Sequence, residues 1–359
     1  MAHSRRKLAW FVRLVVAGLL TWAAWLAVAQ AIAEWYFHRE TLQGFRAAVR
    51  WDPRNPEYHA ALARALEMSL EGDVEEIVHE MEIATRLGPR RADYWAHLAA
   101  VHELRGDAGK AESAYQAAHR LFPNSPDINW KLGNYFVRSG RLIEAMRAFR
   151  TSLTGDSALQ RPAFYIAWRA TEDNDLILNE LVPPEPERLL AYLAYLAETD
   201  RMDAARETWK RLMSLNAAFE PRAAFGYLDA LIRARRLDEL ESAWNALAER
   251  FPLQFPRDAG ARQLIVNSGF EFPISNGGLD WRIGAVEGVT ARMDRQFFYD
   301  GTHALRLDFD GSTNLAYAQL LQYVLVRPHT SYRFIGYIRS RGITTDSGPR
   351  TLLGKRGSD

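Results

Sequence analysis

The chain has 359 residues, of which 48% are hydrophobic and 25% are charged, proportions that are typical of a folded protein. Its 45 basic and 44 acidic side chains leave a net charge of +1, so no overall electrostatic attraction favours nucleic acid as a partner. The absence of cysteine excludes disulfides, thiolate zinc sites, iron–sulfur clusters and cysteine nucleophiles. At about 150 residues per domain, the length predicts roughly two domains.

The N-terminal residues predict a membrane anchor. Residues 1–13 form a basic start that carries Arg5, Arg6, Lys7 and Arg13. Residues 14–37 are predicted to form a transmembrane helix, because the stretch 14–32 contains only Thr21 and Gln30 as appreciably polar side chains. As a helix, this stretch extends about 28 Å. The positive-inside rule then predicts a single-pass protein of the bacterial inner membrane, with its N-terminus in the cytoplasm and most of the chain outside.

Two other interpretations of the same segment stay open. One is a cleaved signal peptide, because Ala29-Gln30-Ala31 fits an A-x-A cleavage site and the basic start fits the n-region of a signal peptide. The other is a buried helix of a soluble protein. The anchor and the signal peptide both place the remainder of the chain outside the cytoplasm.

A repeat with a period of 34 residues follows in the middle of the chain. Six positions of one copy recur 34 residues later. The first set is Leu98, Ala99, Ala111, Tyr115, Ala118 and Pro123, and the second set is Leu132, Gly133, Ala145, Phe149, Ser152 and Ser157. A fixed period of this kind is the signature of stacked helix pairs. With Trp95 added, the first copy resembles the tetratricopeptide (TPR) repeat.

Further copies extend the predicted TPR-like array over residues 41–252. Ile77, Met81 and Ala84 mark an earlier copy, and Ala205, Trp209 and Leu212 are followed 35 residues later by Leu240, Trp244 and Leu247. A shorter, degenerate helix pair is predicted over 164–181, before the prolines of 182–186 end it. The fold class is therefore predicted as mainly α, a TPR α-solenoid with five clear repeats and one degenerate repeat.

The resemblance implies a protein-binding role, because TPR arrays usually hold a peptide or a partner helix on their concave surface. By helical spacing, four polar residues of the first helices are candidates to bind a protein partner: His97, Arg105, Asn134 and Arg138. An ordinary solvated face is the alternative interpretation of these residues. Five aromatic residues are predicted to pack between helices instead: Trp95, Tyr115, Phe149, Trp209 and Trp244.

From residue 264 the pattern changes to glycine turns and alternating residues. Leu305, Leu307 and Phe309 alternate with charged residues, which predicts a half-buried strand, and further strands are predicted over 323–326 and 332–338. Residues 264–350 are accordingly predicted to form a smaller β-sandwich, and residues 351–359 a polar tail.

This segment resembles the jelly-roll carbohydrate-binding modules of galactose-binding-like fold, through Val266 to Glu271, Trp281, Gly301 to Phe309, Gln322 to Val324 and Pro328 to Phe334 in that order. The resemblance implies a structural calcium held by Glu271 and Asp308; otherwise both are outward-facing strand residues. Three aromatic residues are candidates to stack on a sugar ring, or else belong to the core: Trp281, Tyr299 and Tyr317.

The predicted sandwich is incomplete. A jelly roll needs about eight strands, whereas this segment supplies five or six. Either the coding sequence is truncated or frame-shifted, or another chain completes the sheet.

No catalytic constellation is recognised, so the chain is predicted not to be an enzyme. His79-Glu80 begins a zinc-protease motif, but Ile83 stands where the second histidine is needed. Apart from a structural calcium, no cofactor is expected.

The function predicted from these features is a membrane-anchored scaffold that mediates protein–protein interactions outside the inner membrane, in surface polysaccharide or envelope assembly. The alternative is a glycan-binding module carried on a helical spacer, with polysaccharide as a partner. A polysaccharide-modifying enzyme is a third interpretation, because two carboxylates brought together only by folding would escape a motif search.

Overall fold

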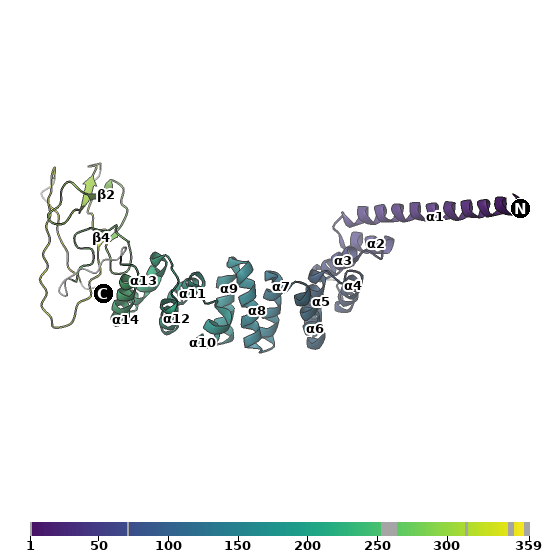
Figure 1. Ribbon diagram of the computed structural model, residues 1–359, viewed down its shortest axis with the longest axis horizontal. Helices are drawn as coiled ribbons and strands as arrows, with labels where there is room; N and C mark the ends of the chain where they lie inside the picture. Colours follow the sequence, from purple (N-terminus) through teal and green to yellow (C-terminus); the bar gives the residue numbers. More distant parts are fainter. Residues whose placement is uncertain (1, 70–71, 253–263, 313–314, 344–347, 355–359) are drawn as a thin grey trace. The chain divides into compact units, whose positions relative to one another are not determined.

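The computed structural model describes residues 2–69, 72–252, 264–312, 315–343 and 348–354. Residues 253–263, at the predicted change of fold, and 355–359, in the predicted polar tail, lie outside the described residues. The chain divides into two compact units, Met1–Pro183 and Pro184–Asp359. The division falls in the proline run that follows the degenerate helix pair (Figure 1).

The first unit begins with one long helix, α1, over Ala2–Phe37. Its portion from Arg13 to Phe37 is long and apolar enough to cross a membrane, a test that a signal sequence also passes. The last turns of α1 pack against α2 (Leu42–Trp51), where Ala33, Ala48 and Tyr58 form a buried cluster. Thr41 caps α2 by accepting a hydrogen bond from the backbone of Gly44.

A stack of antiparallel helix pairs follows, and it confirms the predicted TPR-type α-solenoid. In the first unit the pairs are α3 (Pro56–Met68) with α4 (Val74–Leu87), α5 (Ala92–Arg105) with α6 (Ala108–Leu121), and α7 (Pro126–Arg138) with α8 (Leu142–Gly155). In the second unit they are α11 (Pro186–Glu198) with α12 (Met202–Ser214), and α13 (Phe225–Arg233) with α14 (Leu237–Arg250).

The predicted degenerate pair is also present, in a shorter form. A 3₁₀ turn, Ser157–Leu159, leads into α9 (Gln160–Ala170). The second helix of this pair is only α10 (Asn174–Leu176), continued by a π-helical turn over Ile177–Leu181. Proline at 183 and 184 prevents the helix from continuing beyond this turn.

Within a helix pair, a ring on one helix fills the space left by a small residue on the other. The ring of Phe149 is fully buried and lies against Gly133, where an added Cβ would come within 2.6 Å of the ring. The predicted core role is confirmed for Tyr115, Phe149, Trp209 and Trp244, which are all buried. Trp95 is half-buried and packs against the cluster of Ala92, Ala96, Ala118 and Ile128.

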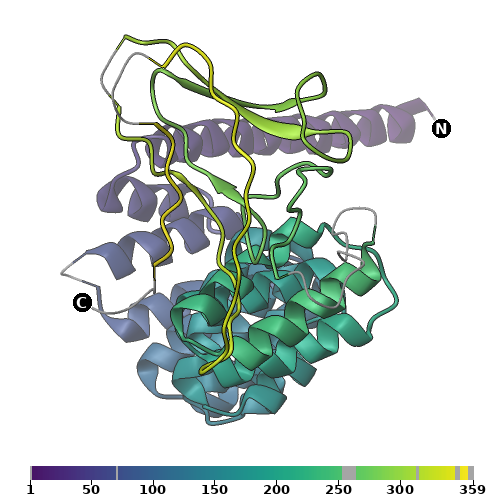
Figure 2. The same cartoon turned by 90° about the vertical axis from the view of Figure 1, so that its left-hand side faces the viewer.

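The C-terminal segment contains short antiparallel strands in two separate pairs (Figure 2). β1 (Arg282–Ile283) pairs with β4 (Leu320–Leu321), and β2 (Val289–Asp294) pairs with β3 (Ala304–Phe309). β3 confirms the strand predicted from the alternation of leucine and charged residues.

The prediction of strands over 323–326 and 332–338 is wrong, because these residues lie in no strand of the described structure. The apolar side chains of 332–338 are exposed, Ile335 by 58%, and in 323–326 only Tyr323 and Leu325 are half-buried. Without a buried face, nothing selects a register for a strand, so an apolar sequence alone is not sufficient to form one.

The start of this segment packs directly on the last helix pair. Gly277 lies against Phe225, and Gly278, with a φ of 56°, lies against Trp244 and Leu228. Side chains at these two glycines would collide with the rings. The segment therefore covers the apolar surface of α13 and α14, as a terminal cap does in repeat proteins.

A pair of glycine-to-alanine variants tests the interlocking of rings and small residues. Gly133→Ala places a methyl group against the ring of Phe149, and we expect it to lower the free energy of unfolding by about 1–3 kcal/mol. Gly109→Ala in α6 meets nothing within 4 Å, so a neutral effect or a gain of up to about 1 kcal/mol is expected. Chemical denaturation of the two variants measures the difference, and equal effects would contradict the packing role.

Candidate functional site

The four residues predicted to bind a partner lie on α5 and α7, and the structure does not bring them into one cluster. Nε2 of His97 lies 2.8 Å from Oε1 of Glu67 on α3. Arg105 donates to Glu75 on α4 at 3.1 Å, and it also pairs with Asp107. Each of these two side chains therefore already has an acidic partner on the preceding repeat.

The remaining two candidates lie one turn apart on α7. Arg138 makes a bidentate contact with Glu103 on α5, with Nη2 2.8 Å from Oε2. Nδ2 of Asn134 donates to the carbonyl of Trp130 on its own helix at 2.8 Å. The side chain of Arg138 is 57% exposed, so it can contact a partner while it keeps the bond to Glu103.

Ion pairs and charged hydrogen bonds of this kind recur between neighbouring repeats. Their partners are separated by 29 to 35 residues, close to the repeat period: Arg46–Glu76, His97–Glu67, Arg105–Glu75, Arg138–Glu103, Arg141–Glu112, Arg147–Glu180, Arg206–Glu239 and Arg236–Asp203. Because most of these groups are exposed, each pair contributes little to stability. The pairs link adjacent repeats across the surface once packing has placed the helices.

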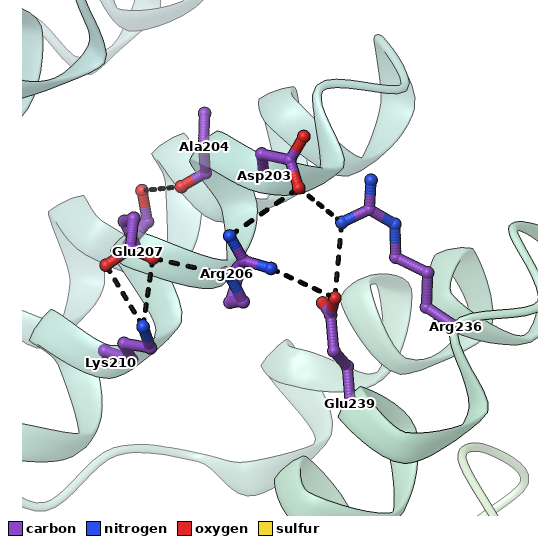
Figure 3. Close-up of polar contacts among 8 residues, drawn as sticks. Asp203, Ala204, Arg206, Glu207, Lys210, Arg236 and Glu239 are labelled. Carbon is purple, nitrogen blue, oxygen red and sulfur yellow. Dashed lines mark hydrogen bonds and ion pairs between the residues drawn. The ribbon is translucent and has the colours of Figure 1, made fainter.

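The densest of these networks joins α12 to α14 (Figure 3). Arg206 and Arg236 both contact Oε1 of Glu239 at 3.3 Å, and Nη1 of Arg236 lies 2.6 Å from Asp203. The hydrogen bond from Arg236 lowers the pKa of Asp203. Two arginines and two carboxylates thus alternate, which neutralises the charges of this surface within the protein.

The acidic partners of these inter-repeat pairs were not among the residues predicted from the sequence. Glu67, Glu75, Glu103 and Glu112 each lie about one repeat from a basic residue. Opposite charges separated by one repeat are the signal that would have indicated them, because equivalent positions on adjacent repeats are neighbours in space.

Two buried histidines sit in contrasting surroundings within the first unit. His59 on α3 is 3% exposed, with Nδ1 2.6 Å from Oε2 of Glu80 and Nε2 3.0 Å from the carbonyl of Pro53. Burial alone would lower its pKa, but Glu80 and the Pro53 carbonyl outweigh burial, so the pKa of His59 is raised. His102 is equally buried, and desolvation with the nearby Arg105 lowers its pKa.

The two residues predicted to hold calcium have other partners. Glu271 accepts hydrogen bonds from the backbone of Thr302 at 2.7 Å and of His303 at 3.1 Å, and from the Thr302 hydroxyl. The hydrogen bonds of Thr302, followed by that of His303, lower the pKa of Glu271 to about 2. Asp308 is paired with Arg292 and Arg306. In the described part of the chain, no group of three or more His, Asp or Glu is placed to hold a metal ion.

The three aromatic candidates for sugar binding differ in exposure. Trp281 is half-buried; its Nε1 donates to the carbonyl of Asn267, and its ring packs on Phe270. Tyr317 is partly buried against Phe309. Tyr299 is 70% exposed and stacks in parallel on Tyr337, with ring centroids 3.5 Å apart. Only Tyr299 of the three presents most of its surface to solvent.

The sequence pattern did not indicate the contact that links the C-terminal segment to α13. Nη2 of Arg282 lies 2.6 Å from Oδ1 of Asp229, which is 53 residues away in the chain, and 2.9 Å from the carbonyl of Gly278. The guanidinium also lies over the ring of Tyr323 at 4.9 Å. Arg282 therefore reinforces the apolar contacts of Gly277 and Gly278 with the last helix pair.

No protein-family model and no curated protein matches the chain. Among solved structures it is similar to pilF of Pseudomonas aeruginosa, at 15% identity over 64% of this chain and 93% of the other, with a TM-score of 0.31. It is also similar to the MamA protein, at 16% identity over 55% and 100% of the two chains with a TM-score of 0.37. PilW, described as a widely conserved type IV pilus biogenesis factor, matches at 16% identity over 55% and 94%, with a TM-score of 0.27. Similarities of this size do not indicate what this chain binds.

The two histidines predict opposite dependences of stability on pH. The pKa of His59 is raised above its ordinary value of 6.5. Its contribution to the free energy of unfolding is therefore complete below about pH 6.5 and is lost as the pH rises through the pKa of His59 in the folded protein. The lowered pKa of His102 makes the unfolded state bind more protons, so stability falls as the pH drops below about 6.5.

Chemical denaturation of His59→Gln between pH 6 and 8 tests the first of these effects. The variant should lack the decline in the free energy of unfolding with rising pH that His59 causes in the unaltered protein. His79→Gln, at an exposed position on α4, is the control and should keep it.

Proposed function

We propose that this chain is a scaffold of helical repeats that binds protein partners, is anchored by α1 in the bacterial inner membrane, and serves envelope or surface polysaccharide assembly outside that membrane. The observation that carries the proposal is the stack of helix pairs. Such a stack builds its core between neighbouring repeats and leaves a long row of side chains from its first helices at the surface.

One column of this surface can be defined from the repeat period. His97, Lys131 and Tyr165 are separated by steps of 34 residues and occupy equivalent positions on α5, α7 and α9. Lys131 and Tyr165 are 44% and 54% exposed. His97 and Lys131 already contact Glu67 and Asp127, so an extended peptide on this column would place apolar side chains on Tyr165 and acidic side chains in competition with these two carboxylates.

The placement in envelope or polysaccharide assembly is supported by the anchor and by the resemblance of the C-terminal segment to carbohydrate-binding modules. No enzymatic step is included in the proposal, because the sequence contains no recognised catalytic constellation. An anchored scaffold would hold its partners at the membrane surface, where its long surface raises their local concentration.

Photo-crosslinking in the full chain tests the binding surface. A photoreactive phenylalanine at Lys131 or Tyr165 should form adducts with a discrete set of proteins, because both positions lie in the proposed column. The same replacement at Ser113 or Gln116, which are exposed on the second helix α6, should give several-fold weaker adducts. Equal adducts from both faces would contradict the surface, and recovery of only cytosolic chaperones or ribosomal proteins would contradict the placement outside the membrane.

A second candidate function is glycan binding, favoured by the exposed parallel pair of Tyr299 and Tyr337. If this pair contacts sugar rings, Tyr299→Ala should weaken retention on the surface polysaccharide of the producing bacterium by roughly tenfold, which corresponds to about 1.4 kcal/mol. Affinity electrophoresis measures the retention. Tyr165→Ala removes an exposed tyrosine of the helical array and should have no effect. A protein that is not retained at all argues against this candidate.

A further inference from the structure

Helix α1 is much longer than a membrane span. Its 36 residues extend about 54 Å, whereas the hydrocarbon core of a bilayer is about 30 Å thick. Only part of α1 can therefore lie in lipid. The two ends of the helix have different surroundings.

The last turns of α1 belong to the core of the helical array. Ala29 is 3% exposed and Ala33 is fully buried, and Tyr36 and Phe37 pack on the cluster that contains Ala48 and Tyr58. The Tyr58 hydroxyl donates to Oε2 of Glu34 at 2.6 Å. These contacts tie the segment 29–37 to α2 and α3, as the first helix of a pair is tied to the second.

Helix α2 lies along this end of α1, and it is too polar for the hydrocarbon layer (Figure 1). At Gly44 the helices approach so closely that an added Cβ would lie 2.6 Å from the carbonyl of Tyr36. Arg46 of α2 pairs with Glu76, and Arg50 is exposed near its end. A charged residue in hydrocarbon costs several kcal/mol, so the bilayer cannot cover the part of α1 that lies beside α2.

The exposed apolar surface of α1 lies before this point. Ten large apolar side chains of residues 10–28 are 45–66% exposed: Trp10, Phe11, Leu14, Val15, Val16, Leu19, Leu20, Trp22, Trp25 and Val28. Leu26 is half-buried. The nineteen residues of 10–28 extend about 28 Å, which matches the hydrocarbon thickness. Arg13 is near the start of this segment, from which its long side chain can reach the headgroups.

We infer that the bilayer contacts residues 10–28 of α1, and that residues 29–37 form the first helix of the array, paired with α2 outside the membrane. This inference rests on the proposed anchoring and shifts the span by several residues from the predicted 14–37. In the sequence Ala29-Gln30-Ala31, Ala29 is buried in a helix that packs on α2, which favours retention of α1 as an anchor over its removal as a signal peptide. The array is thereby joined to the span by a continuous helix, without a linker.

Single cysteines test the position of the span, because the chain has no cysteine of its own. Phe11→Cys and Ala31→Cys distinguish the two spans, with Leu20→Cys as the lipid-facing control and His38→Cys as the aqueous control. Each full-length variant is labelled with a water-soluble maleimide in opened membranes, and labelling after denaturation in detergent sets the full signal. We expect position 38 and position 31 to be labelled, and positions 11 and 20 to be protected.

The other outcomes separate the inference from the proposed anchoring. Protection at 31 together with labelling at 11 would overturn the inference and leave the anchor in place. Labelling at position 20 to the level of position 38 would overturn the anchoring itself. Loss of the signals at 11 and 20 after denaturation, with a shortened chain by mass spectrometry, would show cleavage and contradict retention of α1.

Discussion

The packing of a bulky ring against a small residue on the neighbouring helix is the constraint on which the rest of this structure depends. Gly133 leaves the space that the ring of Phe149 fills, and an added methyl group would collide with that ring. This contact brings α7 and α8 close together within one pair, and the cluster of Ala92, Ala96, Ala118 and Ile128 joins one pair to the next. Because a single pair cannot bury its apolar face, the stability of the array belongs to the stack as a whole.

Charge pairing between repeats is built on this packing. Once the helices are stacked, residues about one period apart become neighbours, and arginines such as Arg105 and Arg138 meet carboxylates of the preceding repeat. Much of the surface charge is neutralised within the array. An acidic partner must therefore compete with these pairs, and also with Asp127 for Lys131, whereas an apolar partner can use an exposed ring such as Tyr165.

Both ends of the array are covered by segments that differ from a standard repeat. At the N-terminal end, the last turns of α1 pair with α2 through Ala33 and Ala48. In the second unit, Gly277, Gly278 and Arg282 attach the C-terminal segment to α13 and α14. These caps protect apolar helix surfaces that would otherwise face water. The start of the C-terminal segment is thus fixed to the last repeat by both apolar and polar contacts.

The sequence by itself determined the helical repeats, the core aromatic residues and strand β3, because these depend on the local period of large, small and polar side chains. Only the tertiary structure showed that Glu271 is bound to Thr302 and His303, that 332–338 forms no strand, and that the end of α1 is buried. Each of these depends on which distant segment lies alongside. An apolar helix has the same sequence pattern whether lipid or α2 covers it, so only packing distinguishes the two.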